Sequence, residues 1–279
     1  MRDPELLTLV LSSMKPGYKE ILFDGQIPTW ISTHRQKGFN ILPYVAHSAT
    51  ASDLFAPSIQ DLEARLARQS IITRAHLNQF RIVKKSPSDS SLFLSRQLFR
   101  RNVWMDSPNK TLLVDVPDSL ATIGFSTLSV LKYSLDNYKF DFMVRTNTSS
   151  YVNLDRLQRF LAKQPKERKV FALSGRWGRQ SYPSGALYVL SRETAEEIVK
   201  KSSKWLHDYI DDVALGILLN LSPDDLVPIP RYEFSNSKLD SADQVIDFDP
   251  QLIHYRCKAN SATKTIQNMK TVHQFVGAN

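Results

Sequence analysis

YKFDFMVRTNTSSYVN, residues 138–153, is the stretch that decides the fold. Apolar side chains alternate through its first half, at Phe140, Phe142 and Val144, and this pattern predicts a half-buried strand over residues 140–145. A polar run, RTNTSS, follows at once and predicts a turn. Ligands of open α/β sheets bind beyond the carboxyl ends of the strands, so we expect this turn to border a ligand site.

Working outward, the flanking segments alternate between helix and strand patterns. Residues 119–137 and 154–163 carry apolar residues at helical spacing, and Ser119 is a suitable cap for the first of these helices. Further helices are predicted near residues 27–32 and over 59–80, and further strands over 6–11, 39–46, 111–116 and 169–174. The alternation predicts an α/β fold, with a mostly parallel sheet flanked by helices on both faces. With 279 residues, of which 42% are hydrophobic, the chain suits a single domain.

Several motifs occur in a fixed order. Asp118-Ser119, Thr127-Leu128, Arg145-Thr146 and Tyr151-Val152-Asn153 are followed by YPSGALYVLS at residues 182–191, and then by Asp211-Asp212-Val213 with Gly216. Together they resemble the core of the Fringe and β1,3-galactosyltransferase family over roughly residues 112–219. The resemblance implies a glycosyltransferase with the GT-A fold, which is Rossmann-like. It implies a nucleotide-sugar-binding half over residues 1–150 and an acceptor and catalytic half over 151–260, and leaves residues 261–279 as an irregular tail.

The chain departs from the family at the turn. Where the family usually has three successive Asp residues that hold a divalent metal, this sequence has Asn147, Thr148 and Ser149. Mn²⁺ and Mg²⁺ favour anionic oxygen ligands, and these side chains bring no negative charge. We therefore expect no required cofactor and no tightly bound metal, with the charge of the diphosphate leaving group stabilised by arginine, lysine, hydroxyl or backbone donors. The alternative is a catalytically inactive binding protein.

The acidic pair Asp211-Asp212 is the candidate for catalysis. A carboxylate at hydrogen-bond distance takes the proton from an acceptor hydroxyl as the new glycosidic bond forms. Matching the motif makes Asp212 the base and Asp211 its neighbour, and direct displacement inverts the anomeric configuration. The predicted helix start places the pair at the positive end of a helix dipole, which is expected to keep both acids ionised. Plain helix-capping acids are the alternative.

The remaining candidate residues fall into two groups. Donor binding is expected from the end of the first strand, the turn, the loop at residues 174–182 and the late basic segment: Ser12, Ser13, Arg145, Thr146, Asn147, Thr148, Ser149, Arg176, Arg179, His254 and Arg256, with Lys258 beside them. Acceptor binding is expected from Trp177, Tyr182, Ser184 and Gly185, with the aromatic rings as sugar platforms. The alternatives are a purely structural His254 and an ordinary exposed hairpin at residues 174–182.

Charge and composition leave the acceptor open. The net charge is +8, and two basic groups stand out, one of Lys163, Lys166, Arg168 and Lys169, the other of Arg96, Arg100, Arg101 and Trp104. We expect a UDP-sugar donor and a glycan or lipid-linked glycan acceptor. The alternative acceptor is hydroxymethylated DNA, as for some phage enzymes, and a third reading is a basic nucleic-acid or carbohydrate-binding protein.

The cellular compartment is predicted from the absence of membrane-spanning, secretory and disulfide patterns in the sequence. No apolar run approaches the roughly 20 residues that cross a bilayer, and residues 6–11 are too few for a secretory core. One cysteine, Cys257, allows no intramolecular disulfide and suits a reducing compartment. We expect a cytoplasmic enzyme, and the alternatives are a peripheral position at the inner membrane surface or, for a viral protein, the host cytoplasm.

Overall fold

The computed structural model describes residues 3–48, 52–75, 87–98, 101–164, 170–177, 180–234 and 251–277. Its centre is an eight-stranded sheet in the order β3-β4-β2-β1-β5-β8-β7-β9. The strands are β1 (Leu6–Ser12), β2 (Asn40–Ala46), β3 (Val103–Asp106), β4 (Thr111–Val114), β5 (Phe142–Asn147), β7 (Val170–Trp177), β8 (Gln180–Ser191) and β9 (Leu226–Val227). The central strands β4, β2, β1 and β5 are parallel, whereas β3 and β8 join them antiparallel.

A second, three-stranded sheet lies beside the carboxyl end of β5. It consists of β10 (Arg231–Glu233), β11 (His254–Arg256) and β6 (Ser150–Val152), in that order. β11 pairs parallel with β10 and antiparallel with β6. Because β6 follows β5 after the turn, the turn connects the two sheets.

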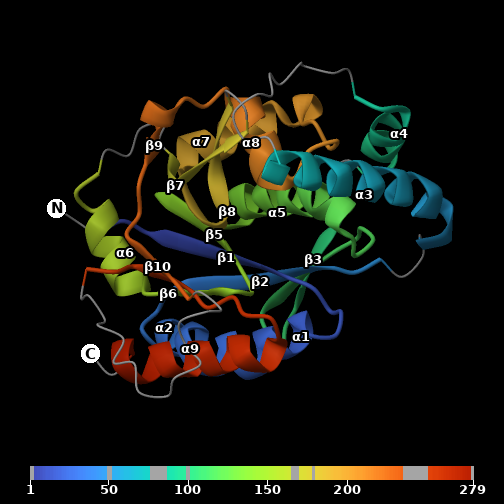
Figure 1. The fold of residues 1–279 in the computed structure, drawn as a ribbon. Coiled ribbons are helices and arrows are strands. Elements are labelled where there is room, and N and C mark those ends of the chain that lie inside the picture. The colour runs from blue at the N-terminus through green and yellow to red at the C-terminus, as the bar shows by residue number, and fades with distance from the viewer. Residues whose placement is uncertain are drawn as a thin grey trace.

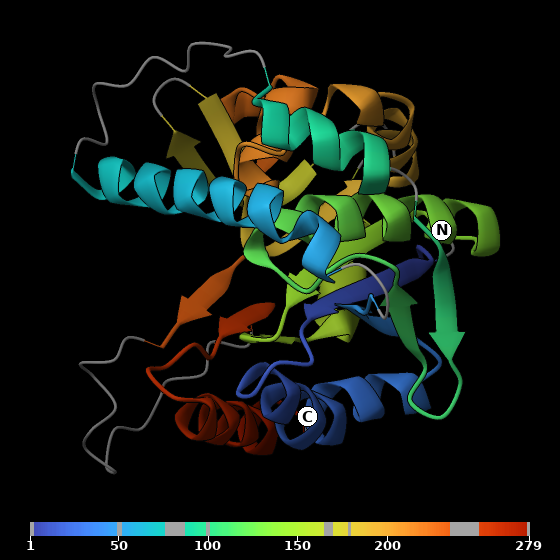
Figure 2. The ribbon, with the colours of Figure 1, turned by 90° about the vertical axis from the view of Figure 1, so that its right-hand side faces the viewer.

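Helices cover both faces of the large sheet (Figures 1 and 2). The core on one face includes residues of α3 (Ser52–Ala75), α4 (Asp89–Leu98), α5 (Ile123–Asn137), α7 (Arg192–Lys200) and α8 (Asp211–Leu219). The core on the other face includes the π-helical segment η1 (Ile21–Ile31), α6 (Leu154–Leu161) and α9 (Ala262–Val276), and η1 is flanked by α1 (Tyr18–Glu20) and α2 (Ser32–Gln36). Short 3₁₀ turns complete the fold: η2 (Leu120–Thr122), η3 (Ser202–Lys204) and η4 (Pro223–Asp225).

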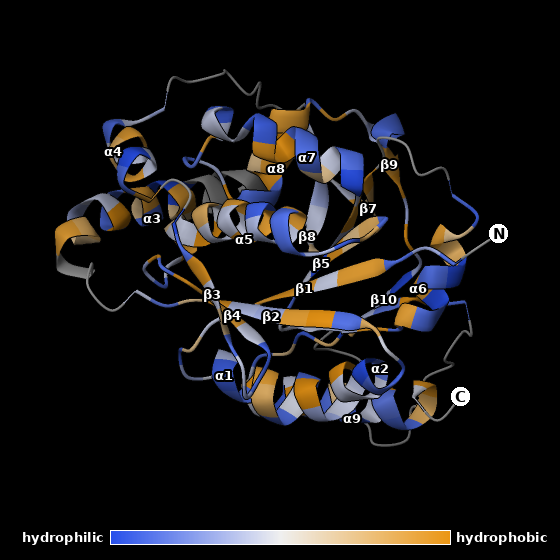
Figure 3. Ribbon diagram, turned by 180° about the vertical axis from the view of Figure 1, so that it is seen from behind, coloured by the Kyte–Doolittle hydropathy of each residue, from blue (hydrophilic) through white to orange (hydrophobic). Residues whose placement is uncertain are grey.

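The two cores follow from the two-residue period of the strands. In β1, Leu7 and Leu9 face the α3–α5 side, while Leu6 and Val10 face the η1–α9 side. Because both faces are buried, β1 is almost continuously apolar, as the strands in Figure 3 show. The predicted α/β class, with a mostly parallel sheet between helical layers, is confirmed.

Most of the predicted elements are present within a few residues of their expected bounds. Ser119 caps η2, immediately before α5, by accepting a hydrogen bond from the amide of Ala121 at 3.0 Å. The helix expected over residues 59–80 begins earlier, at Ser52, and is described to Ala75; residues 76–80 lie outside the described part. The helix expected near residue 27 begins at Tyr18 and runs through η1 into α2.

The carboxyl-terminal segment differs from the expectation of an irregular tail. Residues 262–276 form α9, which Ser261 caps by accepting a hydrogen bond from the amide of Lys264. Met269, Val272 and Val276 recur at helical spacing and are buried against η1. Amphipathic packing therefore makes this segment part of the second core.

No helix in the described ranges is long and apolar enough to cross a membrane.

Candidate active site

The turn after β5 is held by its own first residue. The side-chain oxygen of Asn147 accepts hydrogen bonds from the amide of Ser149 at 3.1 Å and from its hydroxyl at 2.8 Å. An asparagine that bonds to the backbone two residues later makes the chain reverse, so Asn147 builds the bend. From η1, the buried amide of Gln26 donates to the carbonyls of Asn147 and Ser150, at 2.9 and 3.0 Å. The bend is thus fixed from both sides.

These contacts leave the bend poorly suited to a divalent metal. The side-chain oxygen of Asn147 already accepts hydrogen bonds from Ser149, and the side-chain nitrogen of Asn147 donates to the carbonyl of Gly185 at 3.2 Å. A metal would need that oxygen free and would gain no negative charge from Thr148 or Ser149. Within the described ranges, no three His, Cys, Asp or Glu side chains are grouped as a metal site.

Two adjoining cavities meet at the bend. The first, which we call the Asp212 cavity, has a volume of about 430 Å³ and is lined by Tyr182, Ser184, Gly185, Asp211, Asp212 and Arg231, among others. The second, the Ser13 cavity, has a volume of about 570 Å³ and is lined by Ser12, Ser13, Tyr18, Asp118, Thr148, Ser149 and Lys258, among others. Both are lined by Leu11, Ile123, Asn147 and Arg256. The cavities therefore adjoin at the carboxyl ends of β1 and β5, and we call the two together the cleft.

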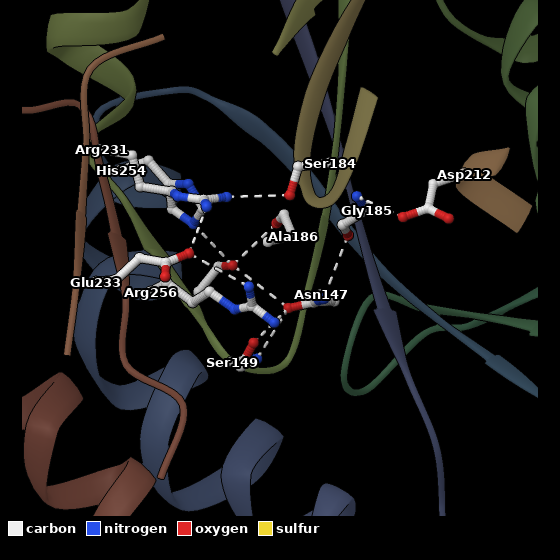
Figure 4. Close-up of polar contacts among 11 residues, drawn as sticks. Asn147, Ser149, Ser184, Gly185, Ala186, Asp212, Arg231, Glu233, His254 and Arg256 are labelled. Atoms are coloured by element: carbon white, nitrogen blue, oxygen red, sulfur yellow. Dashed lines mark hydrogen bonds and ion pairs between the residues drawn. The ribbon is translucent and has the colours of Figure 1, made fainter. Parts of the chain in front are cut away.

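Asp212 is held at the wall of its cavity by two backbone amides. Gly185 donates to one carboxylate oxygen at 3.0 Å and Val213 to the other at 2.8 Å. Figure 4 shows Asp212 reaching from α8 toward Gly185, with Asn147 on the far side of that glycine. Burial, together with the charge of Asp211, raises the pKa of Asp212 to about 6. The shift is opposite to the one expected from the helix dipole, because burial outweighs the amide donors.

Asp211 has a different partner. Its carboxylate accepts a hydrogen bond from Arg145 at 2.5 Å, and the two side chains are 8% and 3% exposed. The same guanidinium donates to the carbonyl of Gly185 at 2.5 Å and to the hydroxyl of Tyr44 at 3.4 Å. Burial acts to lower the pKa of Arg145, but Asp211 outweighs it and the pKa is raised. Arg145 thus ties β5, β8 and the start of α8 together.

The contacts of the acidic pair differ from helix capping. The residue before the first turn of α8 is Ile210, which makes no side-chain cap bond. Asp211 accepts a hydrogen bond from Arg145. Asp212 accepts from the amide of Gly185 in β8 and from the amide of Val213. Gly216 allows this close approach of helix and strand, since a Cβ there would collide with the carbonyl oxygen of Ser181. The pair therefore joins α8 to β8 at the cavity.

The small sheet places polar and charged side chains at alternate positions of its strands. In β10, Arg231 and Glu233 alternate with Tyr232, and in β11, His254 and Arg256 alternate with the buried Tyr255. Arg231 donates to the hydroxyl of Ser184 at 3.0 Å and also pairs with Glu233. Arg256 pairs with the same oxygen of Glu233 at 3.3 Å. Figure 4 shows these three side chains grouped on the other side of Asn147 from Asp212.

His254 is directed into the protein. It is 1% exposed, lines neither cavity, and its Nε2 lies 2.9 Å from the hydroxyl of Ser150. Burial, reinforced by Arg231 and Arg256, holds its pKa well below the ordinary value. His254 is therefore a neutral side chain that supports the bend.

The structure brings most of the predicted site residues to the cleft. Residues at the Asp212 cavity are Arg145, Asn147, Tyr182, Ser184, Gly185, Asp211, Asp212 and Arg256, and those at the Ser13 cavity are Ser12, Ser13, Asn147, Thr148, Ser149 and Arg256. Thr146 lines neither, because it is buried and donates to the carbonyl of Ala186. Of residues 174–182, the described ones end β7 and begin the antiparallel β8, and Arg176 is exposed and lines neither cavity.

Some of the predicted residues lie wholly or partly outside the described part of the chain. Arg179 lies outside the described residues, and of Trp177 only the backbone is described, at the end of β7. Lys166, Arg168 and Lys169 of one basic group, and Arg100 of the other, also lie outside.

The sequence analysis did not predict Arg231 and its partner Glu233 as site residues, nor Lys15, Glu63 and Asp118 at the Ser13 cavity. Arg231 lines the Asp212 cavity and Glu233 pairs with both arginines. Their strand has three residues, too few for a period-two pattern to be recognised. The only signal was the alternation of Arg231, Tyr232 and Glu233 after Pro230.

Comparisons with known proteins give remote structural likeness only. No protein-family model and no curated protein matches this chain. Among solved structures, the galactosyltransferase LgtC in complex with donor and acceptor sugar analogues superposes with a TM-score of 0.45 at 12% identity, over 95% of this chain and 96% of that chain. A glycosyltransferase involved in the glycosylation of the major capsid of PBCV-1 gives 0.39 at 10% identity, over 95% and 100%. These TM-scores lie below 0.5, so the likeness assigns no function.

Proposed function

We propose that this protein is a glycosyltransferase that moves a sugar from a nucleotide-sugar donor to a hydroxyl of a glycan acceptor, with inversion and without a tightly bound metal. One observation carries the proposal. The bend expected to lie under the donor diphosphate and the carboxylate expected to act as base line the same cavity, and Asn147 and Asp212 bond the same residue, Gly185.

The division of the cleft supports separate positions for the two ends of the donor. The Ser13 cavity, beyond the carboxyl end of β1, suits the nucleoside, because ligands of α/β sheets bind at such strand ends and Tyr18 offers a ring at the wall. The diphosphate then lies at the junction, beside Asn147 and Arg256, and the sugar enters the Asp212 cavity. Both volumes fall within the range of about 300–1,000 Å³ typical of ligand sites.

The chemistry follows from the position of Asp212. Its carboxylate takes the proton from the acceptor hydroxyl while the oxygen bonds to the anomeric carbon and the nucleoside diphosphate departs from the opposite face. A single displacement of this kind inverts the anomeric configuration. A pKa of about 6 leaves Asp212 mostly ionised at pH 7 and makes it a stronger base than an ordinary aspartate. Arg145 holds Asp211 and the Gly185 carbonyl, so it positions the base through its neighbours.

The test is a transfer assay with matched variants. A panel of sugar nucleotides, with UDP-sugars first, is incubated with glycan acceptors, and nucleoside diphosphate release and the anomeric configuration of the product are measured. Asp212→Asn is expected to lose about 10²–10⁴-fold in turnover while still binding donor. Asp224→Asn, an exposed residue of η4 that lines neither cavity, is the control. Full turnover by the Asp212→Asn variant would remove Asp212 as the base, and no turnover of any sugar nucleotide by the wild type would contradict the proposal.

Hydroxymethylated DNA remains a second acceptor class, favoured only by the net charge of +8. Transfer to DNA that falls steeply with salt would select it.

A further inference from the structure

The arginines of the small sheet suggest how this chain holds an anion. Arg231 and Arg256 extend from neighbouring parallel strands toward the cavity that contains Asp212. Arg256 also lines the Ser13 cavity, so it stands at the junction of the two. Arg231 is anchored by its bond to Ser184, which lies next to Gly185. One guanidinium group therefore borders both cavities, and a second borders the Asp212 cavity beside it.

Both guanidinium groups converge on one oxygen. Oε1 of Glu233 accepts from Arg231 and, at 3.3 Å, from Arg256. One carboxylate thus faces two cations, and the trio keeps a net charge of +1. The Nε atoms of Arg231 and Arg256 are buried and, within the part of the chain that the structure describes, have no hydrogen-bond partner. The guanidinium pair therefore carries charge that Glu233 does not balance.

The carboxylate is held loosely. The Glu233 side chain is 50% exposed, while those of its partners Arg256 and Arg231 are 32% and 13% exposed. Solvent screens a carboxylate of this exposure, so its ion pairs with Arg231 and Arg256 are weak and an anion can displace it. A phosphate or diphosphate brings more charge and several acceptor oxygens, which match the planar fork of arginine. Such an anion competes well against a single carboxylate.

We propose that Arg231 and Arg256 form a diphosphate clamp in which Glu233 is an internal counter-ion, displaced when the ligand binds. Glu233 sits where an anionic group of the ligand will sit and keeps the two cations together until then. The clamp supplies positive charge at the edge of the bend where Asn147, Thr148 and Ser149 supply none. This inference rests on the proposed function in taking the diphosphate to be that of a nucleotide sugar.

Binding of inorganic pyrophosphate tests the clamp without requiring transfer. Isothermal titration calorimetry of the whole protein is expected to show about tenfold weaker binding for Arg231→Gln and for Arg256→Gln. Glu233→Gln is expected to bind about three- to tenfold more tightly, because the competing charge is gone. Uridine, which lacks phosphate, is expected to bind all three variants like the wild type.

Matched controls separate the clamp from net charge. Glu196→Gln removes a carboxylate that pairs with Arg192 on α7, and Arg65→Gln removes a guanidinium paired with Asp61 on α3; neither residue lines a cavity. Neither change is expected to move pyrophosphate affinity by more than about twofold. If Arg231→Gln fails to fold, Arg231→Lys keeps the charge without the fork and is expected to bind with intermediate affinity.

Two results would overturn the inference. Weaker pyrophosphate binding by Glu233→Gln would make Glu233 a support for the arginines, and unchanged binding by both arginine variants would remove the clamp. The proposed function fails separately: the expected order of pyrophosphate affinities without turnover of any sugar nucleotide would keep the clamp and reject the transferase. Sugar transfer by a protein whose pyrophosphate binding does not depend on the arginines would keep the transferase and reject the clamp.

Discussion

The amide nitrogen of Gly185 donates to the carboxylate of Asp212 at 3.0 Å, so the proposed base is placed by a backbone group of β8. The carbonyl of the same residue accepts from Arg145 and from Asn147. One glycine therefore connects the bend, the buried arginine and the base. A Cβ at this position would lie 2.9 Å from Asp212 Oδ2, which explains why only glycine suits it.

Gly185→Ala is expected to displace Asp212 and lower turnover by about 10- to 100-fold, because small misplacements of reacting groups are costly. Binding of uridine in the Ser13 cavity should not change. Gly25→Ala is the control, since its added methyl would meet side-chain atoms of Ile266 and Met269 at 3.3 Å, which can move. Steady-state kinetics with thermal melts measure both effects, and wild-type turnover in the Gly185→Ala variant would mean that the contact does not place the base.

The dependence of turnover on pH should follow Asp212. Its pKa of about 6 predicts that kcat/KM rises with pH, reaches half its maximum near pH 6 and levels off above pH 7. The base acts only when ionised, so activity is lost as pH falls. Rates measured from pH 5 to 8, with Asp224→Asn as a control that keeps the profile, test this expectation. A profile that is flat from pH 5 to 8 would point to another base.

The raised pKa of Asp212 also predicts that the stability of the fold decreases as pH rises, whereas turnover increases. Because the folded-state pKa of Asp212 lies above its ordinary value of 3.8, the folded protein binds this proton more tightly than the unfolded chain does. The stability that it contributes is full at low pH and is lost as pH rises through about 4 to 6. Asp212→Asn removes the dependence, so its melting temperature should rise relative to wild type by about 5 °C between pH 4 and pH 7. A difference that stays constant with pH would contradict the raised pKa.

Breaking the buried pair of Arg145 and Asp211 should destabilise the fold. Arg145→Met leaves Asp211 without its cation and is expected to lower the free energy of unfolding by about 3–5 kcal/mol. The double variant with Asp211→Asn should recover part of this loss, because no buried charge is then left alone. Urea denaturation of the single and double variants measures the coupling. Equal stability of wild type and Arg145→Met would show that the pair holds nothing together.

Removal of divalent metal should leave turnover unchanged. The Asn147 oxygen is occupied by Ser149, and the bend brings no carboxylate, so the residues present do not fit a tightly bound cation. Turnover in EDTA is expected to stay within about twofold of that in Mn²⁺. Activity abolished by EDTA and restored only by Mn²⁺ would reject metal independence.

Local pattern determined much of the fold. The strand and bend at residues 140–150 and the helix capped near Ser119 follow from side-chain period and capping chemistry, which act over a few residues. Ordered motifs also directed attention to the bend and to the acidic pair before their proximity was known. These features are local, so the sequence alone contains them.

Long-range packing decided the rest. Arg145 was expected at the donor, yet tertiary contacts engage it with Asp211 and Gly185, 66 and 40 residues away along the chain. Likewise, a role for residues 231–233 becomes visible only when β10 pairs with β11, because that pairing brings Arg231, Glu233 and Arg256 together. The sequence determined which chemical groups the protein carries and which short segments form helices and strands. Only the tertiary structure decided which of those groups are buried and paired and which face the cleft, because burial and charge pairing depend on neighbours that are distant in the chain.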